Sequence, residues 1–207
     1  MSVILSVDCC LRLTGAALMV DGEITASEQG DLGRRQSQEL PLMTERLLAR
    51  SNLAWDFLDY VALTNGPGYF TGIRVGAAYA SGVAYASGAK VIPVSSLELL
   101  AASSGQAGRV KVLAVVYAGH GFVYASCEGF LEAGEYTLDE IHEWLTKNPD
   151  AVIISDDPQR TALQGVQILT VKPDVRTLCE LAKNRTQFAI SPMELKISYF
   201  RAPQGVN

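Results

Sequence analysis

The sequence predicts a two-lobed α/β protein in which each lobe is a mixed β-sheet covered by helices. Apolar, β-branched segments that suit antiparallel strands open the chain, and strand and helix patterns alternate after them, as in a mixed sheet with both faces covered. The same order of patterns begins again at residue 112, which indicates a degenerate internal repeat. With 207 residues and 48% hydrophobic side chains, the chain can build two small cores. We expect a first lobe over residues 1–97 and a smaller second lobe over 98–207.

The first lobe is expected to begin with an antiparallel meander. Residues 3–8 are largely apolar, as in a strand buried on both faces, and Asp21 and Gly22 are suited to a two-residue hairpin turn. In the first helical pattern, Pro41 either starts or kinks the helix. The expected strands are 3–8, 11–20, 23–29, 60–64 and 90–94, and the helical patterns lie around 40–48, up to 87–88, and after 95 or 96.

The second lobe is expected to repeat this beginning. Residues 112–117 match the first strand of the chain, and residues 121–127 match the strand that returns beside it. Helices and strands then alternate as far as residue 183. The expected elements after residue 127 are helices at 138–147, 158–164 and 174–183 and strands at 151–155 and 166–171.

Composition and charge exclude several classes of protein. The chain carries 17 Lys and Arg against 22 Asp and Glu, a net charge of −5, and neither half contains a strongly basic arm. The chain alone is therefore expected to bind RNA weakly. No basic segment precedes the first strand, as it would in a secretory signal, and the longest low-charge stretch, 73–89, is too short and polar to span a bilayer. We expect a cytoplasmic protein that does not enter a membrane.

Neither metal binding nor hydrolysis has a matching motif. The histidines, His120 and His142, lack the spacing of a zinc site, and no G-x-S-x-G nucleophile elbow is present. The four cysteines, at positions 9, 10, 127 and 179, show neither C-x-x-C pairs nor a disulfide framework, and we expect them to be buried apolar residues. The sequence predicts no catalytic residue, no metal site and no intrinsic cofactor.

Asp8 is the best single candidate for a chemical role. It ends the first buried strand, and ligands of open α/β sheets bind at the carboxyl ends of strands. The alternative is that Asp8 only caps the turn before the second strand. Phosphoryl transfer requires acidic groups placed around the phosphates. The equivalent residue of the repeat is Tyr117, so a site with two carboxylates is not supported.

A glycine-rich loop precedes the second predicted helix. Gly66 and Gly68 could leave backbone N–H groups free to face an anion near Thr71, at the start of the helix. The loop lacks the Lys of Walker A and has the wrong glycine spacing for a Rossmann loop. It predicts either a phosphate cradle, which would form a vestigial nucleotide cleft with Asp8, or a rigid turn from strand to helix.

Small residues recur every four positions along the helix that follows this loop. Glycine inside a helix costs up to about 1 kcal/mol relative to alanine, so this stripe requires a compensating close contact with another backbone. The contact is either with the chain's own sheet or helices, or with a partner subunit. In the second case the predicted interface, which includes one face of the preceding helix, consists of Leu40, Met43, Leu47, Gly72, Arg74, Gly76, Ala80 and Ala84.

The segment around the glycine loop resembles the signature of a known family. Residues 66–76 are similar to the G-P-G-x-F-T-G-x-R-x-G motif of the TsaB (YeaZ) family, the bacterial accessory subunit of tRNA threonylcarbamoyladenosine biosynthesis. Weaker similarities extend over most of the chain. They lie at residues 4–8, 112–115, 121–124 and 199–201.

The resemblance implies an actin-like fold of two RNase H-like lobes and a pseudoenzyme. Family members resemble the catalytic TsaD subunit but lack its metal-binding histidines. They pair with TsaD through helices of the first lobe, and can homodimerise through the same surface when alone. TsaD transfers a threonylcarbamoyl group to adenosine 37 of tRNAs that read ANN codons, and a TsaE ATPase joins the pair. ATP, magnesium and tRNA would therefore act only through the wider complex.

The chain departs from the family pattern at three places. Cys9 and Cys10 replace the usual Thr-Ser after Asp8, residues 117–119 replace a common Asp-Ala-Arg, and Gln36 stands where a histidine often opens the first helix. The function that we expect is a noncatalytic subunit that binds and activates TsaD. The alternatives are a small-molecule kinase or ATPase of the actin-like superfamily, which would use Asp8 and the glycine loop, and a divergent freestanding homodimer.

Overall fold

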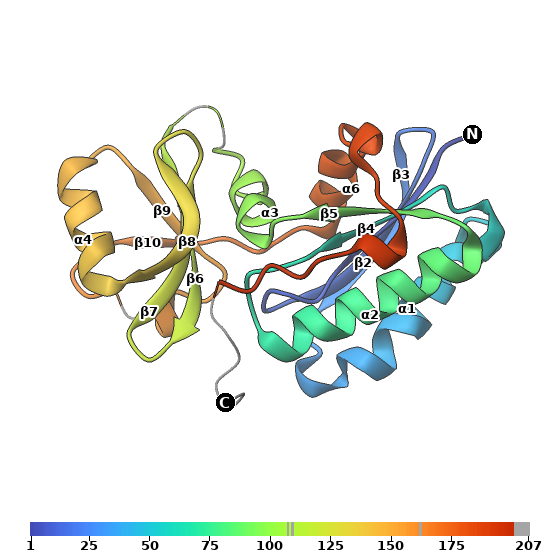
Figure 1. Ribbon diagram of the computed structural model, residues 1–207, viewed down its shortest axis with the longest axis horizontal. Coiled ribbons are helices and arrows are strands. Elements are labelled where there is room, and N and C mark those ends of the chain that lie inside the picture. The colour runs from blue at the N-terminus through green and yellow to red at the C-terminus, as the bar shows by residue number, and fades with distance from the viewer. Residues whose placement is uncertain (107, 109, 162, 201–207) are drawn as a thin grey trace.

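Two five-stranded sheets lie side by side in the computed structural model, which describes residues 1–106, 108, 110–161 and 163–200 (Figure 1). The strand order is β3-β2-β1-β4-β5 in the first sheet and β10-β9-β6-β7-β8 in the second. Counted from the first strand of each sheet, both have the order 3-2-1-4-5, with an antiparallel meander followed by parallel strands. This is the topology of an RNase H-like lobe, and its repetition confirms the predicted two-lobed α/β fold.

In the first sheet, β1 is the central strand. It pairs antiparallel with β2 and parallel with β4, and all six of its residues are buried, as its apolar sequence requires. Asp21 and Gly22 both have positive φ, 50° and 86°, the conformation that the predicted two-residue hairpin turn needs. The five strands are β1 Val3–Asp8, β2 Thr14–Val20, β3 Glu23–Gly30, β4 Tyr60–Thr64 and β5 Lys90–Val94.

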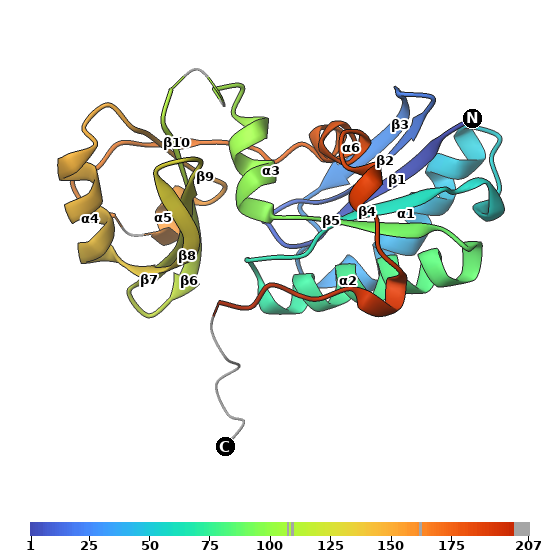
Figure 2. The same cartoon turned by 45° about the horizontal axis from the view of Figure 1, so that its top comes forward.

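Helices cover both faces of the first sheet (Figure 2). Helices α1 (Gln36–Arg50) and α2 (Phe70–Ser87) pack on one face, and α6 (Val175–Lys183) packs on the other. Pro41 lies inside α1, in its second turn. The 73–89 stretch belongs mainly to α2, and no helix in the described part of the chain has the length and apolar character needed to cross a membrane.

The position of α6 corrects the predicted boundary between the lobes. This helix follows the second sheet in sequence, yet Val175, Leu178 and Cys179 belong to the core of the first lobe. The spacing of apolar residues that predicted α6 indicates a helix with one apolar face, but it does not indicate which sheet covers that face. Residues 98–207 therefore do not form one continuous lobe.

The second sheet includes a strand that the sequence analysis missed. β8 lies at the edge of the sheet and has polar, partly exposed positions, so it lacks the apolar run by which strands such as β6 and β9 were predicted. Helix α5 ends earlier than the predicted 158–164, and residue 162 lies outside the described residues. The elements are β6 Val112–Gly119, β7 Phe122–Cys127, β8 Leu131–Thr137, α4 Leu138–Lys147, β9 Val152–Ser155, α5 Pro158–Thr161 and β10 Ile168–Thr170.

A shared core joins the two lobes. Leu11, which follows β1, and Leu97, from α3 (Ser96–Ser103), are both buried against the second sheet. Their partners there include Val116 and Ile154. This packing fixes the carboxyl ends of β1 and β9 close together, between the lobes.

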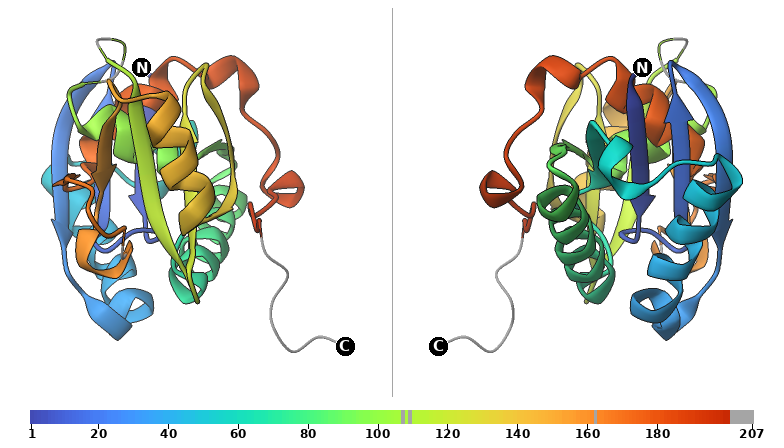
Figure 3. Two further views of the ribbon diagram at one scale, coloured as in Figure 1. Left: turned by 90° about the vertical axis from the view of Figure 1, so that its left-hand side faces the viewer. Right: turned by 90° about the vertical axis from the view of Figure 1, so that its right-hand side faces the viewer.

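The C-terminal segment returns along the first lobe (Figure 3). Residue Ile190 forms an antiparallel bridge with Val91, which covers the edge of β5. A short 3-10 turn, Thr186–Phe188, precedes this bridge, and a second one, Pro192–Glu194, follows it. The chain then runs beside α2 toward the second lobe (Figure 2). Of the family-like segment at 199–201, Arg201 lies outside the described residues.

Candidate functional site

The first candidate site is the space between the lobes, where β1 ends in Asp8. The side chain of Asp8 is only 3% exposed, and its Oδ1 accepts hydrogen bonds from the backbone N–H of Cys10 (2.9 Å) and the hydroxyl of Thr64 (2.5 Å). Burial raises the pKa of Asp8 to about 6; these hydrogen bonds oppose the shift, and the negative charge of Asp156 adds to it. Asp8 therefore does cap the turn after β1, as the alternative interpretation proposed.

A second buried carboxylate, which the sequence analysis missed, comes from the other lobe. Asp156 follows β9, and its Oδ2 accepts a hydrogen bond from the backbone N–H of Arg12 (2.8 Å). Burial raises the pKa of Asp156 above its ordinary value. The signal in the sequence was an acidic residue directly after a predicted strand, the same signal that pointed to Asp8. Within the described ranges, no three His, Cys, Asp or Glu side chains come together as they would in a metal site.

The glycine loop is packed by the chain's own backbone. A Cβ atom added to Gly68 would lie 2.1 Å from the carbonyl oxygen of Cys10, and one added to Gly66, where φ is +108°, would lie 2.7 Å from that of Ser198. The backbone N–H of Tyr69 donates to the same Cys10 oxygen at 2.9 Å. These contacts favour the rigid turn over the phosphate cradle, because the glycines permit a close backbone approach.

The predicted members of the nucleotide cleft lie in different surroundings. Asp8 is buried, Gly66 and Gly68 face the chain's own backbone, and Thr71 lies exposed at the start of α2. At the position equivalent to Asp8, the ring of Tyr117 lies 4.6 Å from the guanidinium of Arg160. The repeat position of Asp8 therefore holds an aromatic ring and a guanidinium, and the second carboxylate comes instead from Asp156, which corrects the expectation that the site has no second carboxylate.

The second candidate site is the face formed by α1 and α2, and here the predicted interface needs correction. Seven of its eight residues are buried against the chain's own sheet or loops, so they offer no surface to a partner. A Cβ atom on Gly76, for example, would lie 3.3 Å from the Cβ of Cys9. Arg74 is the exposed member, and the buried members are Leu40, Met43, Leu47, Gly72, Gly76, Ala80 and Ala84.

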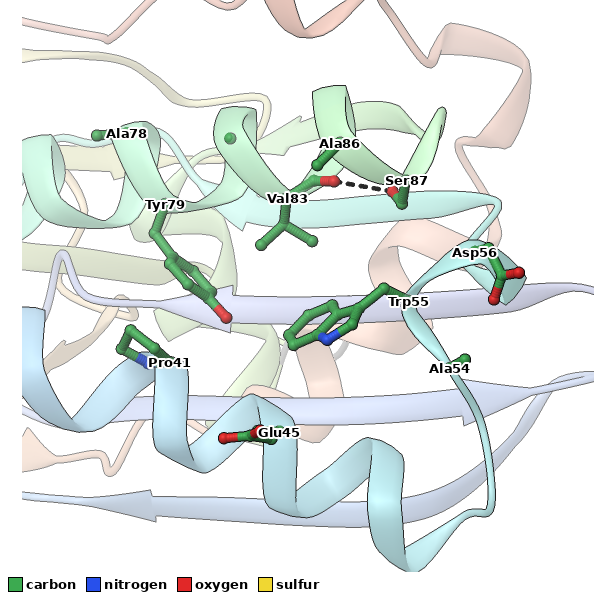
Figure 4. A pocket seen from close by; sticks show the side chains of 11 residues that line it. Pro41, Glu45, Ala54, Trp55, Asp56, Ala78, Tyr79, Val83, Ala86 and Ser87 are labelled. Carbon is green, nitrogen blue, oxygen red and sulfur yellow. Dashed lines mark hydrogen bonds between the residues drawn. The ribbon is translucent and has the colours of Figure 1, made fainter.

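An apolar groove of about 860 Å³ remains open on the outer side of the same two helices (Figure 4). Tyr79 and Val83 project from α2 toward α1, and Trp55, which is 38% exposed, lies between the helices. The hydroxyl groups of Tyr79 and Thr44 are hydrogen-bonded and connect α2 to α1. The residues that line the groove are Pro41, Glu45, Ala54, Trp55, Asp56, Ala78, Tyr79, Gly82, Val83, Ala86 and Ser87.

A second stripe of small residues on α2 could have revealed this groove. Ala78, Gly82 and Ala86 also recur every four positions, and all three are exposed and line the groove. The predicted interface lies on the longer stripe, which packs inward. A Cβ atom on Gly82 would have no neighbouring atom within 4 Å. The exposed stripe therefore has the open space that close approach of another helix requires.

Comparison with known proteins identifies a family and a fold. The TsaD family model, tRNA N6-adenosine threonylcarbamoyltransferase, matches residues 29–194. The chain is 33% identical to the tRNA threonylcarbamoyladenosine biosynthesis protein TsaB of Haemophilus influenzae over 59% of its own length and 52% of that protein. It is 30% identical to TsaB of Escherichia coli K12 over 72% of its length and 62% of that protein.

A solved structure from Pseudomonas aeruginosa has the same fold. That protein, described as having similarity to peptidase YEAZ, superposes with a TM-score of 0.82 at 23% identity. The superposition covers 97% of this chain and all of that one. The sequence matches to the two TsaB relatives, in contrast, span between about half and three fifths of those proteins.

Proposed function

The chain belongs to the family defined by the TsaD model, among its TsaB (YeaZ) relatives, and on that premise we propose that it is a noncatalytic subunit that binds and activates a TsaD-like threonylcarbamoyltransferase. In this role it takes part in forming threonylcarbamoyladenosine at position 37 of tRNAs that read ANN codons, with a TsaE-like ATPase, in the cytoplasm. The observation that carries the proposal is the open apolar groove between α1 and α2.

The groove has the features of a surface that receives a helix. Exposed apolar patches mark interaction sites in folded proteins. Ala78, Gly82 and Ala86 would let a partner helix approach the backbone of α2 closely. Trp55 offers a large apolar side chain of the type that contributes most binding energy in protein interfaces.

The charges around the groove favour a basic partner over a second copy of this chain. Glu45 and Asp56 are the charged residues that line the groove, and both are acidic. A homodimer formed through this face would bring both acidic pairs to one interface, where like charges repel. A TsaD-like helix pair with Lys or Arg at its edge would complement them. Self-association through the same groove is therefore the weaker alternative.

The space between the lobes supports the noncatalytic part of the proposal. Both buried carboxylates, Asp8 and Asp156, are held by backbone N–H groups, and the glycine loop is packed by main chain. The presence of two carboxylates from opposite lobes is the one observation that favours the kinase or ATPase alternative. Calorimetry with ATP and magnesium on the isolated chain tests it, because only that alternative expects binding that Asp8→Asn abolishes.

The groove is tested by Gly82→Leu. The isolated chain can accommodate this side chain, since nothing lies within 4 Å of the new Cβ, but the leucine would occupy the groove. We expect loss of co-elution with the TsaD-like protein of the same organism and no fall in the melting temperature of the isolated chain. Glu180→Leu, which places the same side chain on the exposed face of α6, is the matched control and should co-elute as the wild type does.

Undiminished co-elution of Gly82→Leu would overturn the proposed groove interface. If Gly82→Leu converts an isolated dimer to a monomer and leaves the TsaD pairing intact, the groove serves self-association instead. Leucine at Gly76 or Ala80 cannot make this distinction. Both positions are buried against the chain's own structure, so a bulky side chain there tests folding and not partner binding.

A further inference from the structure

Two groups of aromatic and arginine side chains meet where α2 begins, between the lobes, through the adjacent residues Tyr69 and Phe70. Together they draw on three parts of the chain: the start of α2, the second lobe, and the C-terminal segment. We call the two groups together the aromatic belt. It consists of Tyr69, Phe70, Arg74, Tyr117, Arg160 and Tyr199.

The contacts within the belt hold both guanidinium groups on aromatic rings. The guanidinium of Arg74 lies 3.9 Å from the centroid of the Phe70 ring, and its Nε donates a hydrogen bond to the Tyr199 hydroxyl at 3.1 Å. The rings of Phe70 and Tyr199 are 5.7 Å apart. Arg160 lies over Tyr117 in the same manner. The charged planes are therefore oriented before any ligand arrives.

The belt is open to solvent at its Arg74 end. Phe70 is 44% exposed and Tyr199 is 38% exposed, so the rings leave apolar area in water. Several other arginines form ion pairs with carboxylates, whereas Arg74 forms none within the described part of the chain. At the other end, the charge of Asp157 acts on Arg160. An anion is accordingly favoured beside Arg74, which forms no ion pair with any residue that the structure describes.

We propose that the aromatic belt is a contact site for an unpaired stretch of RNA. A base stacks on the exposed face of Phe70, Tyr199 or the Arg74 guanidinium, and Arg74 binds the adjacent phosphate. Stacking on aromatic and guanidinium planes combined with phosphate contacts is how proteins bind single-stranded nucleic acid. If these side chains served only to hold the two lobes together, the rings would be expected to be buried in the contact and not exposed to solvent.

This inference rests on the proposed function, since it adds RNA contacts of this subunit to those of its TsaD-like partner. The net charge of −5 makes strong RNA binding by the isolated chain unfavourable. We therefore expect the belt to act mainly in the pair, where the partner supplies most of the affinity. The test uses both the isolated chain and the pair.

The test measures fluorescence anisotropy of a labelled single-stranded RNA of about 12 nucleotides, a length within the range of known single-strand sites. The same sequence as a duplex and a range of salt concentrations complete the series. Phe70→Leu and Arg74→Gln should each weaken single-strand binding at least about fivefold. Arg74→Gln should also lower the slope of log K against log salt by about 0.7.

Matched controls remove the same kinds of side chain elsewhere. Phe188→Leu replaces a ring that is 69% exposed on the C-terminal segment, and Arg50→Gln removes an exposed arginine at the end of α1. Both should bind RNA as the wild type does. Melting temperatures of all four variants, and their co-elution with the TsaD-like partner, show whether each still folds and pairs.

Three results would overturn the belt proposal. The first is that Phe70→Leu and Arg74→Gln both bind RNA with wild-type affinity, or that the wild type shows no detectable RNA binding either alone or in the pair. The second is equal binding of the duplex, or equal competition by polyglutamate, which would indicate attraction by charge alone. The third is loss of co-elution in Arg74→Gln, which would assign Arg74 to the partner interface. Failure of the groove interface would be seen separately, in Gly82→Leu.

Discussion

Replacing each of three glycines in α2 by alanine measures how closely this helix is packed at three positions. Gly72, Gly76 and Gly82 share one helix, so alanine adds the same methyl group and restricts the unfolded chain in the same way at each. This common effect favours alanine by about 0.5–1 kcal/mol. Differences in stability between the three variants therefore report what each new methyl group meets.

The three methyl groups meet very different surroundings. At Gly82 no atom lies within 4 Å, at Gly76 the nearest is the Cβ of Cys9 at 3.3 Å, and at Gly72 the nearest is the Cys9 carbonyl oxygen at 1.9 Å. We expect Gly82→Ala to stabilise the protein by about 0.5–1 kcal/mol and Gly76→Ala to be nearly neutral, because a small shift offsets the gain. Gly72→Ala should destabilise by at least about 2 kcal/mol, since helix and loop must move apart.

Urea denaturation followed by far-ultraviolet circular dichroism measures all three differences. In thermal unfolding, Gly82→Ala should raise Tm by about 1–4 °C for a chain of this size. Equal stability of Gly72→Ala and Gly82→Ala would refute the reasoning. It would mean that the approach of Cys9 to α2 does not restrict that helix.

Two further predictions concern Asp8. Because its pKa is about 6 in the folded protein and 3.8 ordinarily, the folded state binds the proton more tightly, so stability falls as pH rises from about 4 to about 6. The amide oxygen of Asp8→Asn can accept the same two hydrogen bonds, so this variant should lose the pH dependence and be more stable at pH 7.5 by on the order of 2–3 kcal/mol. Urea denaturation at pH 4.5 and 7.5 measures the difference. A variant that kept the wild-type pH dependence would contradict the prediction. Thr64→Val removes the hydroxyl that donates to Asp8 and should lower the stability of the protein by about 1–3 kcal/mol at pH 7.5. The loss of stability should be smaller at pH 4.5, where Asp8 is protonated. Equal losses at the two pH values would show that the hydroxyl does not stabilise the carboxylate.

Local patterns in the sequence were sufficient for most helices and strands. The predicted bounds of β4, β5 and α4 agree with the structure, because each element is delimited by residues within or beside it. Helix α4, for example, is capped by Thr137, whose side chain accepts a hydrogen bond from the backbone N–H of Glu140. The glycine loop was likewise recognisable from its own residues.

Elements that depend on distant neighbours were harder to predict. Strand β8 owes its place to pairing with β7 and not to an apolar run of its own. The apolar face of α6 was visible, but the sheet that covers it follows from a chain path that returns to the first lobe. Asp156 became part of the candidate site only because the lobes bring the ends of β1 and β9 together.

The sequence by itself determined the two-lobed fold, the position of the glycine loop and the presence of small residues along α2. The tertiary structure alone decided which of the two small-residue stripes on α2 is buried and which lines the groove. Both stripes consist of glycine and alanine at the same spacing, so periodicity cannot distinguish them. The rotation of the helix is set by the main chain at Cys9 and Cys10, which approaches Gly68 and Gly72 too closely for any side chain and leaves Gly82 facing outward.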